Sequence, residues 1–340
     1  MLASVRRRRG RLLSLSLSLS LSRPGPVVTE CRICGEATDL SIRATERMFG
    51  FGGEFWYDRC GSCGGLQLRE IPENLSAFYP DNYYAFDTKG ASPGRARAWI
   101  RLLRDALVLG RARRFTRWIE PLLSPGMLQL RGWLERAGAS RDSRILDVGC
   151  GDGAWLRRLR DQGYQHVLGV DPFIASPIER GGKLLVKKGT LDDVDGEWDL
   201  IMFHHSLEHI ADQRGTLARV ADLLAPSGCC LIRIPIVSSH AWEEYRDRWV
   251  QLDAPRHLML HSTASLERLA ESVGLRVDAV VHDSTMFQFE GSELYRRDRP
   301  LTELSTSSYS RSQRRTFAAR AAALNAEGRG DQAAFYLRRR

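Results

Sequence analysis

The chain has 340 residues, 43% of them hydrophobic, so it is long enough for two domains or for one large domain with additions. Its net charge of +9 is concentrated in residues 1–26, 91–118 and 311–340, which carry +6, +7 and +6 and leave −10 for the remainder. An acidic body argues against a protein that grips nucleic acid over a broad basic surface, and no run of 18 apolar residues predicts a membrane span.

Residues 1–26 are predicted to form a disordered basic tail of low complexity. Arg6 to Arg9 precede a stretch in which Leu and Ser alternate, from Leu12 to Ser22. That alternation is too polar for the apolar part of a secretion signal, and no small-residue cleavage site follows it. Because the chain also has an odd number of cysteines, seven, we expect a protein of a reducing compartment, the cytoplasm.

Residues 27–90 contain two Cys-x-x-Cys-Gly units. Two cysteines at this spacing can bind one metal ion, and the glycine after each pair permits the positive φ of a tight turn. Four thiolates would complete the tetrahedral coordination of a structural Zn²⁺ ion. Two redox dithiols or buried packing cysteines are the alternatives, and the pairing within one short segment favours zinc. The predicted zinc ligands are Cys31, Cys34, Cys60 and Cys63.

Residues 91–140 are predicted to be helical, because apolar residues from Trp99 to Leu134 recur at helical spacing among arginines. Two interpretations fit the basic helix around residues 95–118. It is a lid or linker packed on the following domain, or it makes a peripheral contact with an anionic membrane. The lid is the favoured interpretation.

From residue 141 to residue 295, short apolar runs alternate with amphipathic segments, which predicts parallel βαβ units. A hydrophobic strand ending at Val148 runs into a glycine-rich turn and a helix, so backbone can approach a ligand closely at the helix N-terminus. The next strand ends in Asp171, where a carboxylate is placed to accept hydrogen bonds from ribose hydroxyls. The turn contains Gly149, Gly151 and Gly153.

The charges around this turn indicate which ligand it binds. A dinucleotide-binding enzyme would share the strand, the glycines and the acid, but it would present a pyrophosphate to the turn. Asp147 before the turn and Asp152 within it would repel that group. Two carboxylates suit instead the ammonium and sulfonium groups of S-adenosylmethionine, which is the predicted cofactor.

At these residues the chain resembles the class I S-adenosylmethionine-dependent methyltransferases, from about residue 143 to 295. The resemblance implies an α/β, Rossmann-like, seven-stranded methyltransferase sheet with helices on both faces, preceded by a zinc-ribbon-like module and a helical linker. It also implies that the segment after the third strand lines the adenine and that the fourth strand ends at the cofactor. The cofactor-binding residues expected from the resemblance are Asp147, Gly149, Gly151, Gly153, Asp171, Leu191, Asp192 and His204.

More narrowly, residues 27–295 are similar to zinc-ribbon methyltransferases of glycan and secondary-metabolite pathways. The matching stretches are Trp249–His257 and Phe287–Glu293. This similarity predicts methyl transfer to a hydroxyl of a small-molecule or saccharide acceptor. An RNA-modifying methyltransferase and a non-catalytic binding protein with the same fold are the alternatives. The acidic body disfavours the RNA-modifying enzyme, and the intact glycines and acids disfavour the non-catalytic binding protein.

The acceptor is expected at the carboxyl ends of the strands, beside His204–His209 and beside the insertion 237–261. A histidine with a pKa near neutral is the usual group that removes a proton from an acceptor hydroxyl. The candidates are His205, His209 and His257. The aromatic residues of the insertion, Trp242, Tyr245 and Trp249, are expected to form a rim that suits a sugar ring or to pack beneath a loop.

His205, Glu208 and His209 have the spacing i, i+3 and i+4, which places them on one face of a helix if the chain turns helical after the fourth strand. With His257 they would form a second divalent metal site, for which imidazole ligands favour Zn, Fe, Mn or Co over Mg. The alternative is that these residues only pack and hydrogen-bond. Residues 296–340, finally, are basic and Ala-rich and are predicted to form a helical surface extension.

Overall fold

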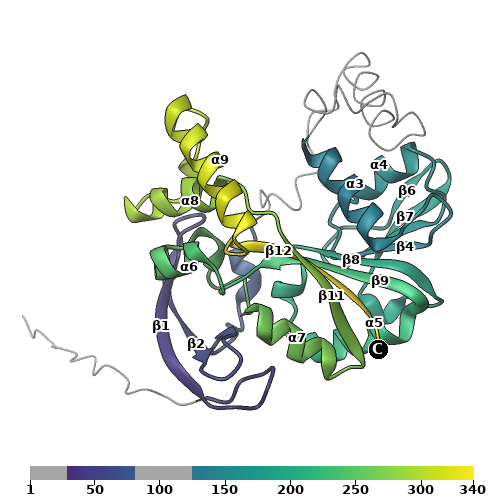
Figure 1. Cartoon of the computed structure of the whole chain (residues 1–340), viewed down its shortest axis with the longest axis horizontal. Coiled ribbons are helices and arrows are strands. Elements are labelled where there is room, and N and C mark those ends of the chain that lie inside the picture. The colour runs from purple at the N-terminus through teal and green to yellow at the C-terminus, as the bar shows by residue number, and fades with distance from the viewer. Residues whose placement is uncertain (1–28, 81–124) are drawn as a thin grey trace, which may run out of the picture.

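The computed structural model describes residues 29–80 and 125–340 (Figure 1). The predicted basic tail and most of the predicted helical linker, with the basic helix around residues 95–118, lie outside these residues. The described residues form two β-sheets, seven α-helices and several 3-10 turns. No helix in this part of the chain is long and apolar enough to cross a membrane.

The larger sheet has eight strands in the order β11-β12-β9-β8-β4-β5-β7-β6. The five strands from β9 to β7 run parallel, β12 is antiparallel to β9 and β11, and β6 is antiparallel to β7. The sheet therefore has the predicted number of seven strands and one more, the short edge strand β6. The strands are β4 (Ile145–Val148), β5 (Val167–Asp171), β6 (Ile178–Arg180), β7 (Lys183–Lys188), β8 (Trp198–His204), β9 (Leu224–Pro235), β11 (Leu275–His282) and β12 (Gln332–Arg339).

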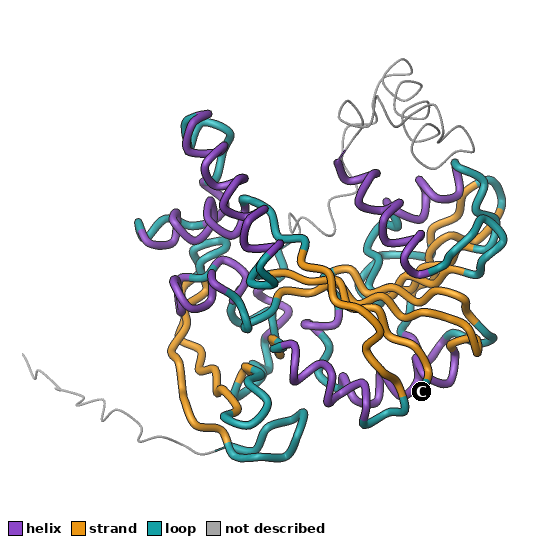
Figure 2. Tube along the Cα trace, viewed as in Figure 1, coloured by secondary structure: helices purple, strands orange, loops and turns teal. Residues whose placement is uncertain are grey.

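Helices cover both faces of this sheet, as Figure 2 shows. The run of apolar residues in β8 is buried on both sides, as expected for a central parallel strand. Leu200 and Met202 pack with α3 (Pro125–Ala137) and α4 (Ala154–Asp161). Ile201 and Phe203 pack with α5 (Gln213–Leu223) and α7 (Thr263–Glu271). The predicted Rossmann-like α/β methyltransferase fold is confirmed.

The prediction of a helical surface extension over residues 296–340 is wrong for its last part. The helix α9 (Arg311–Ala326) is present, but β12 follows it and lies between β11 and β9 inside the sheet (Figure 1). The segment Ala333–Leu337 is buried throughout. Its alanines suggested a helix, whereas the apolar run Ala-Ala-Phe-Tyr-Leu meets the needs of a strand covered on both faces. The main sheet therefore extends beyond residue 295, to the end of the chain.

The smaller sheet has four strands in the order β1-β2-β3-β10. Its first three strands come from the predicted zinc module, whereas β10 comes from the insertion between β9 and α7, so the module is built into the rest of the protein. A core of aromatic and aliphatic side chains joins this sheet to α6, α8 and α9. The elements are β1 (Thr38–Glu46), β2 (Gly52–Cys60), β3 (Leu66–Leu68), β10 (Met259–Leu260), α6 (His240–Tyr245) and α8 (Phe287–Arg296).

Candidate active site

The carboxyl ends of β4, β5 and β8 meet at one edge of the main sheet and enclose a cavity of about 710 Å³. Parallel strands bring their following loops together at this edge, so residues distant in sequence share the wall. Seven of the eight predicted cofactor-binding residues line the cavity, and Gly153 does not. The seven are Asp147, Gly149, Gly151, Asp171, Leu191, Asp192 and His204.

Close packing requires glycine at two positions of the turn, Gly149 and Gly153. Gly149 has a φ of 71°, and a Cβ atom there would lie 2.5 Å from the Cβ of Ser206. Gly153 has a φ of 72° and caps α4, where a Cβ atom would lie 2.6 Å from Val186 Cγ2 on β7. Gly149 thus lets the turn approach the loop after β8, whereas Gly153 lets α4 approach the sheet from behind the cavity.

Asp171 ends β5 and is held by backbone amides on both of its oxygens. Gly151 N donates to Oδ2 at 2.8 Å, and Phe173 N donates to Oδ1 at 2.8 Å. The remaining electron pairs of the carboxylate are available to ribose hydroxyls. Asp147 lies at the base of the turn, where burial and the neighbouring Asp171 raise its pKa to about 8. Its Oδ1 has no hydrogen-bond partner among the described residues, so this atom is ready to receive a donor group.

Asp152 does not have the role predicted for it, which was to attract the positive groups of the cofactor together with Asp147. Arg157 Nη2 donates to Asp152 Oδ2 at 2.6 Å, and Ala154 N donates to Oδ1 at 3.0 Å. The guanidinium compensates this carboxylate, so Asp152 contributes little net attraction for a cationic ligand. The carboxyl groups of this wall that no guanidinium of the described residues compensates are those of Asp147 and Asp171, and a bound cation would favour the ionised form of Asp147.

Two other predicted residues, Leu191 and His204, also line the cavity. Leu191 is buried on the 3-10 turn Leu191–Asp193, which Thr190 caps. His204 at the end of β8 lies against Trp133, with 4.5 Å between the ring centroids. Burial, and then the neighbouring Arg233, lower the pKa of His204 to about 3, so this imidazole is neutral. Neither of its ring nitrogens has a partner among the described residues.

The segment after β8 is not the α-helix that the histidine spacing assumed. His205 has a φ of 51°, and Leu207–His209 form a single 3-10 turn. His205 lines the cavity, but Arg233 Nη1 donates to its Nε2 at 2.8 Å, because a guanidinium can only donate. Its Nδ1 lies 3.4 Å from Glu208 Oε1. Both ring nitrogens are engaged, which argues against the predicted catalytic part of His205 and for a positioning one.

Glu208, His209 and His257 are brought together, whereas His205 is not part of this group. One ligand atom from each of the three lies within 4.8 Å of the others. Leu258 N donates to Glu208 O at 2.8 Å and ties the 3-10 turn to the insertion. Burial opposes the ionisation of Glu208, but the neighbouring imidazoles outweigh burial and lower its pKa to about 2. The predicted four-residue cluster is therefore a cluster of three.

His209 and His257 are both oriented through Nδ1. The Nδ1 of His209 lies 2.9 Å from Arg256 O, and the Nδ1 of His257 lies 2.8 Å from Gln251 O. A carbonyl only accepts, so each Nδ1 carries the hydrogen and each Nε2 keeps an electron pair. His209 reaches the cavity wall, whereas His257 is buried behind it. Burial, and then His209, lower the pKa of His257 to about 4.

Sequence reasoning missed Tyr79 and Phe173. Tyr79 lines the cavity, with its hydroxyl 3.1 Å from His209 Nδ1, and its ring is stacked on Phe173 at a centroid distance of 6.3 Å. Phe173, which also lines the cavity, is 70% exposed. Tyr79 lies in a turn-rich segment 130 residues before His209, and no local pattern could have signalled their contact.

The aromatic residues of the insertion do not form an acceptor rim. Trp242, Tyr245 and Trp249 are buried together in the core that joins the two sheets. Trp249 Nε1 donates to Asp331 Oδ2 at 2.9 Å, so the polar edge of this ring is also used internally. The packing alternative was correct for these three residues.

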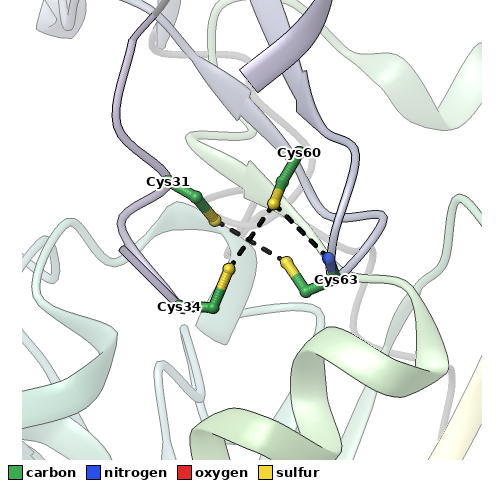
Figure 3. A group of neighbouring side chains, drawn as sticks. All are labelled: Cys31, Cys34, Cys60 and Cys63. Atoms are coloured by element: carbon green, nitrogen blue, oxygen red, sulfur yellow. Dashed lines mark hydrogen bonds between the residues drawn. The ribbon is translucent and has the colours of Figure 1, made fainter. Parts of the chain in front are cut away.

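The four predicted zinc ligands converge, as Figure 3 shows. Cys31 Sγ lies 3.6 Å from Cys63 Sγ, and Cys34 Sγ lies 3.5 Å from Cys60 Sγ. Bonds of about 2.3 Å to a tetrahedral zinc ion require sulfur separations of roughly 3.8 Å, so the cluster fits zinc, whereas a disulfide requires about 2.05 Å. A hydrogen bond with Cys63 lowers the pKa of Cys31 to about 5, which favours the thiolate.

Comparison with known proteins supports the assignment of the main sheet. Residues 115–280 match the family model described as "Methyltransferase domain". A ubiquinone biosynthesis O-methyltransferase from Aeromonas salmonicida is 26% identical over 175 residues, which cover 46% of this chain and 73% of that protein. A trans-aconitate 2-methyltransferase from Deinococcus radiodurans is 28% identical over 104 residues, 29% of this chain and only 40% of that protein.

Among solved structures, a S-adenosylmethionine-dependent methyltransferase from Archaeoglobus fulgidus is 20% identical, with a TM-score of 0.37 over 61% of this chain and 98% of that one. The residues that match the family model include the glycine turn, Asp171 and the parallel strands from β4 to β9. The chain is an enzyme that carries a class I S-adenosylmethionine-dependent methyltransferase domain.

Proposed function

We propose that this enzyme transfers the methyl group of S-adenosylmethionine to a hydroxyl oxygen of a small-molecule or saccharide acceptor. The observation that carries the proposal is the position of His209, which lines the same cavity as the predicted cofactor-binding residues and keeps the electron pair of its Nε2. Relatives named as ubiquinone biosynthesis O-methyltransferases support oxygen as the methylated atom. The cytoplasmic location expected from the cysteines belongs to the same proposal.

Each wall of the cavity has a separate task in this reaction. When bound, S-adenosylmethionine supplies a methyl group attached to a sulfonium. Asp171 holds the ribose, and the glycine turn with Asp147 receives the amino-acid end. His209 is the one residue of the cluster of Glu208, His209 and His257 that lines the cavity, and the electron pair of its Nε2 favours loss of the acceptor proton. The acceptor oxygen gains the methyl group, and its proton leaves at this cluster.

The cysteine cluster is proposed to hold one structural zinc ion. The four cysteine sulfurs would fill all four coordination positions of the zinc ion, so no position is left for a substrate. Ser262 Oγ donates to Cys63 O, and Arg214 Nη2 donates to Ile33 O at 2.6 Å. By holding these cysteines, the metal would fix the smaller sheet against α5 and α7.

The test combines an unbiased product search with one variant. The full chain is incubated with a small-molecule extract and with S-adenosylmethionine that carries a deuterated methyl group, and labelled products are identified by mass spectrometry and NMR. We expect a labelled methyl ether, and we expect His209→Phe to lose it while retaining affinity for S-adenosylhomocysteine. Label found only on nitrogen, on carbon or in RNA would contradict the proposal, and label in RNA would favour the RNA-modifying alternative.

A further inference from the structure

Three electron-pair donors converge beside the cavity with no hydrogen atom supplied between them. They belong to the cluster of Glu208, His209 and His257, whose ligand atoms lie within 4.8 Å of one another. Each neutral imidazole donates its only N–H to a backbone carbonyl, because Nδ1 of His209 faces Arg256 O and Nδ1 of His257 faces Gln251 O. In neutral imidazoles the Nε2 atoms are then acceptors, like the carboxylate that they face.

The carboxylate of Glu208 is only partly paired by the described residues, because His205 Nδ1 is its one ion-pair partner there and lies at a long 3.4 Å from Oε1. Its side chain is 0% exposed, and neither oxygen has a hydrogen-bond partner among the described residues. A buried carboxylate with one distant donor is incompletely compensated, and the electron pairs of two neutral imidazoles facing it add to the cost. A cation between the three groups would resolve it.

The surroundings of the two imidazoles are those of metal ligands. A ligating histidine usually donates its other ring N–H to a carbonyl or a carboxylate, which fixes the tautomer and orients the ring. Both imidazoles of the cluster have this arrangement. The two rings are held in a T-shaped arrangement, at a centroid distance of 4.7 Å and an interplanar angle of 71°, so they are not stacked.

We propose that Glu208, His209 and His257 bind a divalent transition-metal ion whose open positions face the cavity. This inference rests on the proposed function, since the acceptor would complete the site with its hydroxyl oxygen. Two imidazoles and one carboxylate suit Zn, Fe, Co or Mn better than Mg. When His209 Nε2 binds the ion, it no longer accepts the acceptor proton; the ion would instead lower the pKa of the bound hydroxyl, whose proton would pass to water. An acceptor with two adjacent oxygens, such as a catechol or a vicinal diol, would bind through both.

The experiment measures metal binding without any acceptor. The full chain is purified with its cysteine cluster loaded with zinc and is titrated with Mn²⁺, which prefers oxygen and nitrogen to thiolate ligands, while free Mn²⁺ is followed by electron paramagnetic resonance. We expect about one Mn²⁺ per chain. Glu208→Gln and His257→Gln should each weaken binding by roughly tenfold or more. His240→Gln, on α6, is the matched control and should bind Mn²⁺ like the wild type.

Affinity for S-adenosylhomocysteine reports whether each variant is folded, because neither Glu208 nor His257 lines the cofactor cavity. Absence of Mn²⁺ binding by the wild type up to about 1 mM would overturn the metal site, as would unchanged binding by two folded variants. If such a metal-free protein still forms the methyl ether, the metal site is refuted and the proposed function is retained. Tight Mn²⁺ binding that both variants lose would support the site even if no methyl ether forms.

Discussion

Replacing Asp171 with alanine is expected to weaken S-adenosylhomocysteine binding by roughly 10- to 100-fold. In the protein each oxygen of Asp171 accepts one backbone N–H at 2.8 Å, which fixes the carboxylate toward the cavity. A hydrogen bond to a charged group contributes about 1.5–3 kcal/mol, and each 1.4 kcal/mol is a factor of ten in affinity. Loss of one net ribose hydrogen bond gives the expected range, and loss of two would exceed it.

Isothermal titration calorimetry measures this change directly. The variant is expected to stay folded, because the amides of Gly151 and Phe173 border an open cavity in which water can replace the carboxylate. Asp195→Ala is the matched control, since the Asp195 side chain is 99% exposed and lies away from the cavity. Equal affinities of wild type and Asp171→Ala, within about twofold, would refute the assignment of Asp171 to the ribose.

Three further predictions concern metal content and stability. Cys63→Ser should lose about one zinc ion per chain by elemental analysis of reduced protein, and wild type without zinc would contradict the cysteine site. Arg256→Met should lower the free energy of unfolding in urea by about 3–5 kcal/mol, because it leaves the fully buried Glu46 without its ion pair; a loss below about 1 kcal/mol would contradict this. Burial raises the pKa of Asp331 to about 6, so the folded chain keeps a proton that the unfolded chain releases near pH 4. The contribution of Asp331 to stability should therefore fall as the pH rises from 4 to 6, so Asp331→Asn should gain on the order of 3 kcal/mol relative to wild type over that range; parallel pH profiles of the two proteins would contradict the pKa shift.

The cofactor half of the site could be predicted from the sequence because it is local. A strand, a glycine turn and a helix follow one another from Asp147 to Gly153, and Asp171 ends the adjacent strand. Parallel neighbours place such ends at one edge whatever the rest of the chain does. The error over Asp152 has a local cause too, because the sequence shows its charge but not that Arg157, one helical turn on, compensates it.

Burial by distant segments explains the larger errors. For the insertion aromatics the sequence left open a rim or packing beneath a loop, and the decision lies with β1, β2 and α9, which cover them and which no residue near Trp242 or Trp249 in sequence indicates. The strand β12 was taken as helix because the composition around it is rich in alanine and arginine. Its place between β9 and β11 is set by pairing with strands that lie about 50 and 100 residues earlier, from the registers of those pairs.

The acceptor side depends on the same distant contacts, and they suggest what the N-terminal module does for catalysis. Arg256 is fully buried and binds Glu46 of β1 at 2.7 Å and Phe78 O at 2.9 Å through its guanidinium. Its own carbonyl holds His209 Nδ1, and Tyr79, next to Phe78, reaches the same nitrogen. The module thus fixes both neighbours of His209, the one imidazole of the three-residue cluster that reaches the cavity. Arg256→Met should then disturb methyl transfer more than cofactor affinity, because the cofactor-binding residues on β4 and β5 lie outside this chain of contacts.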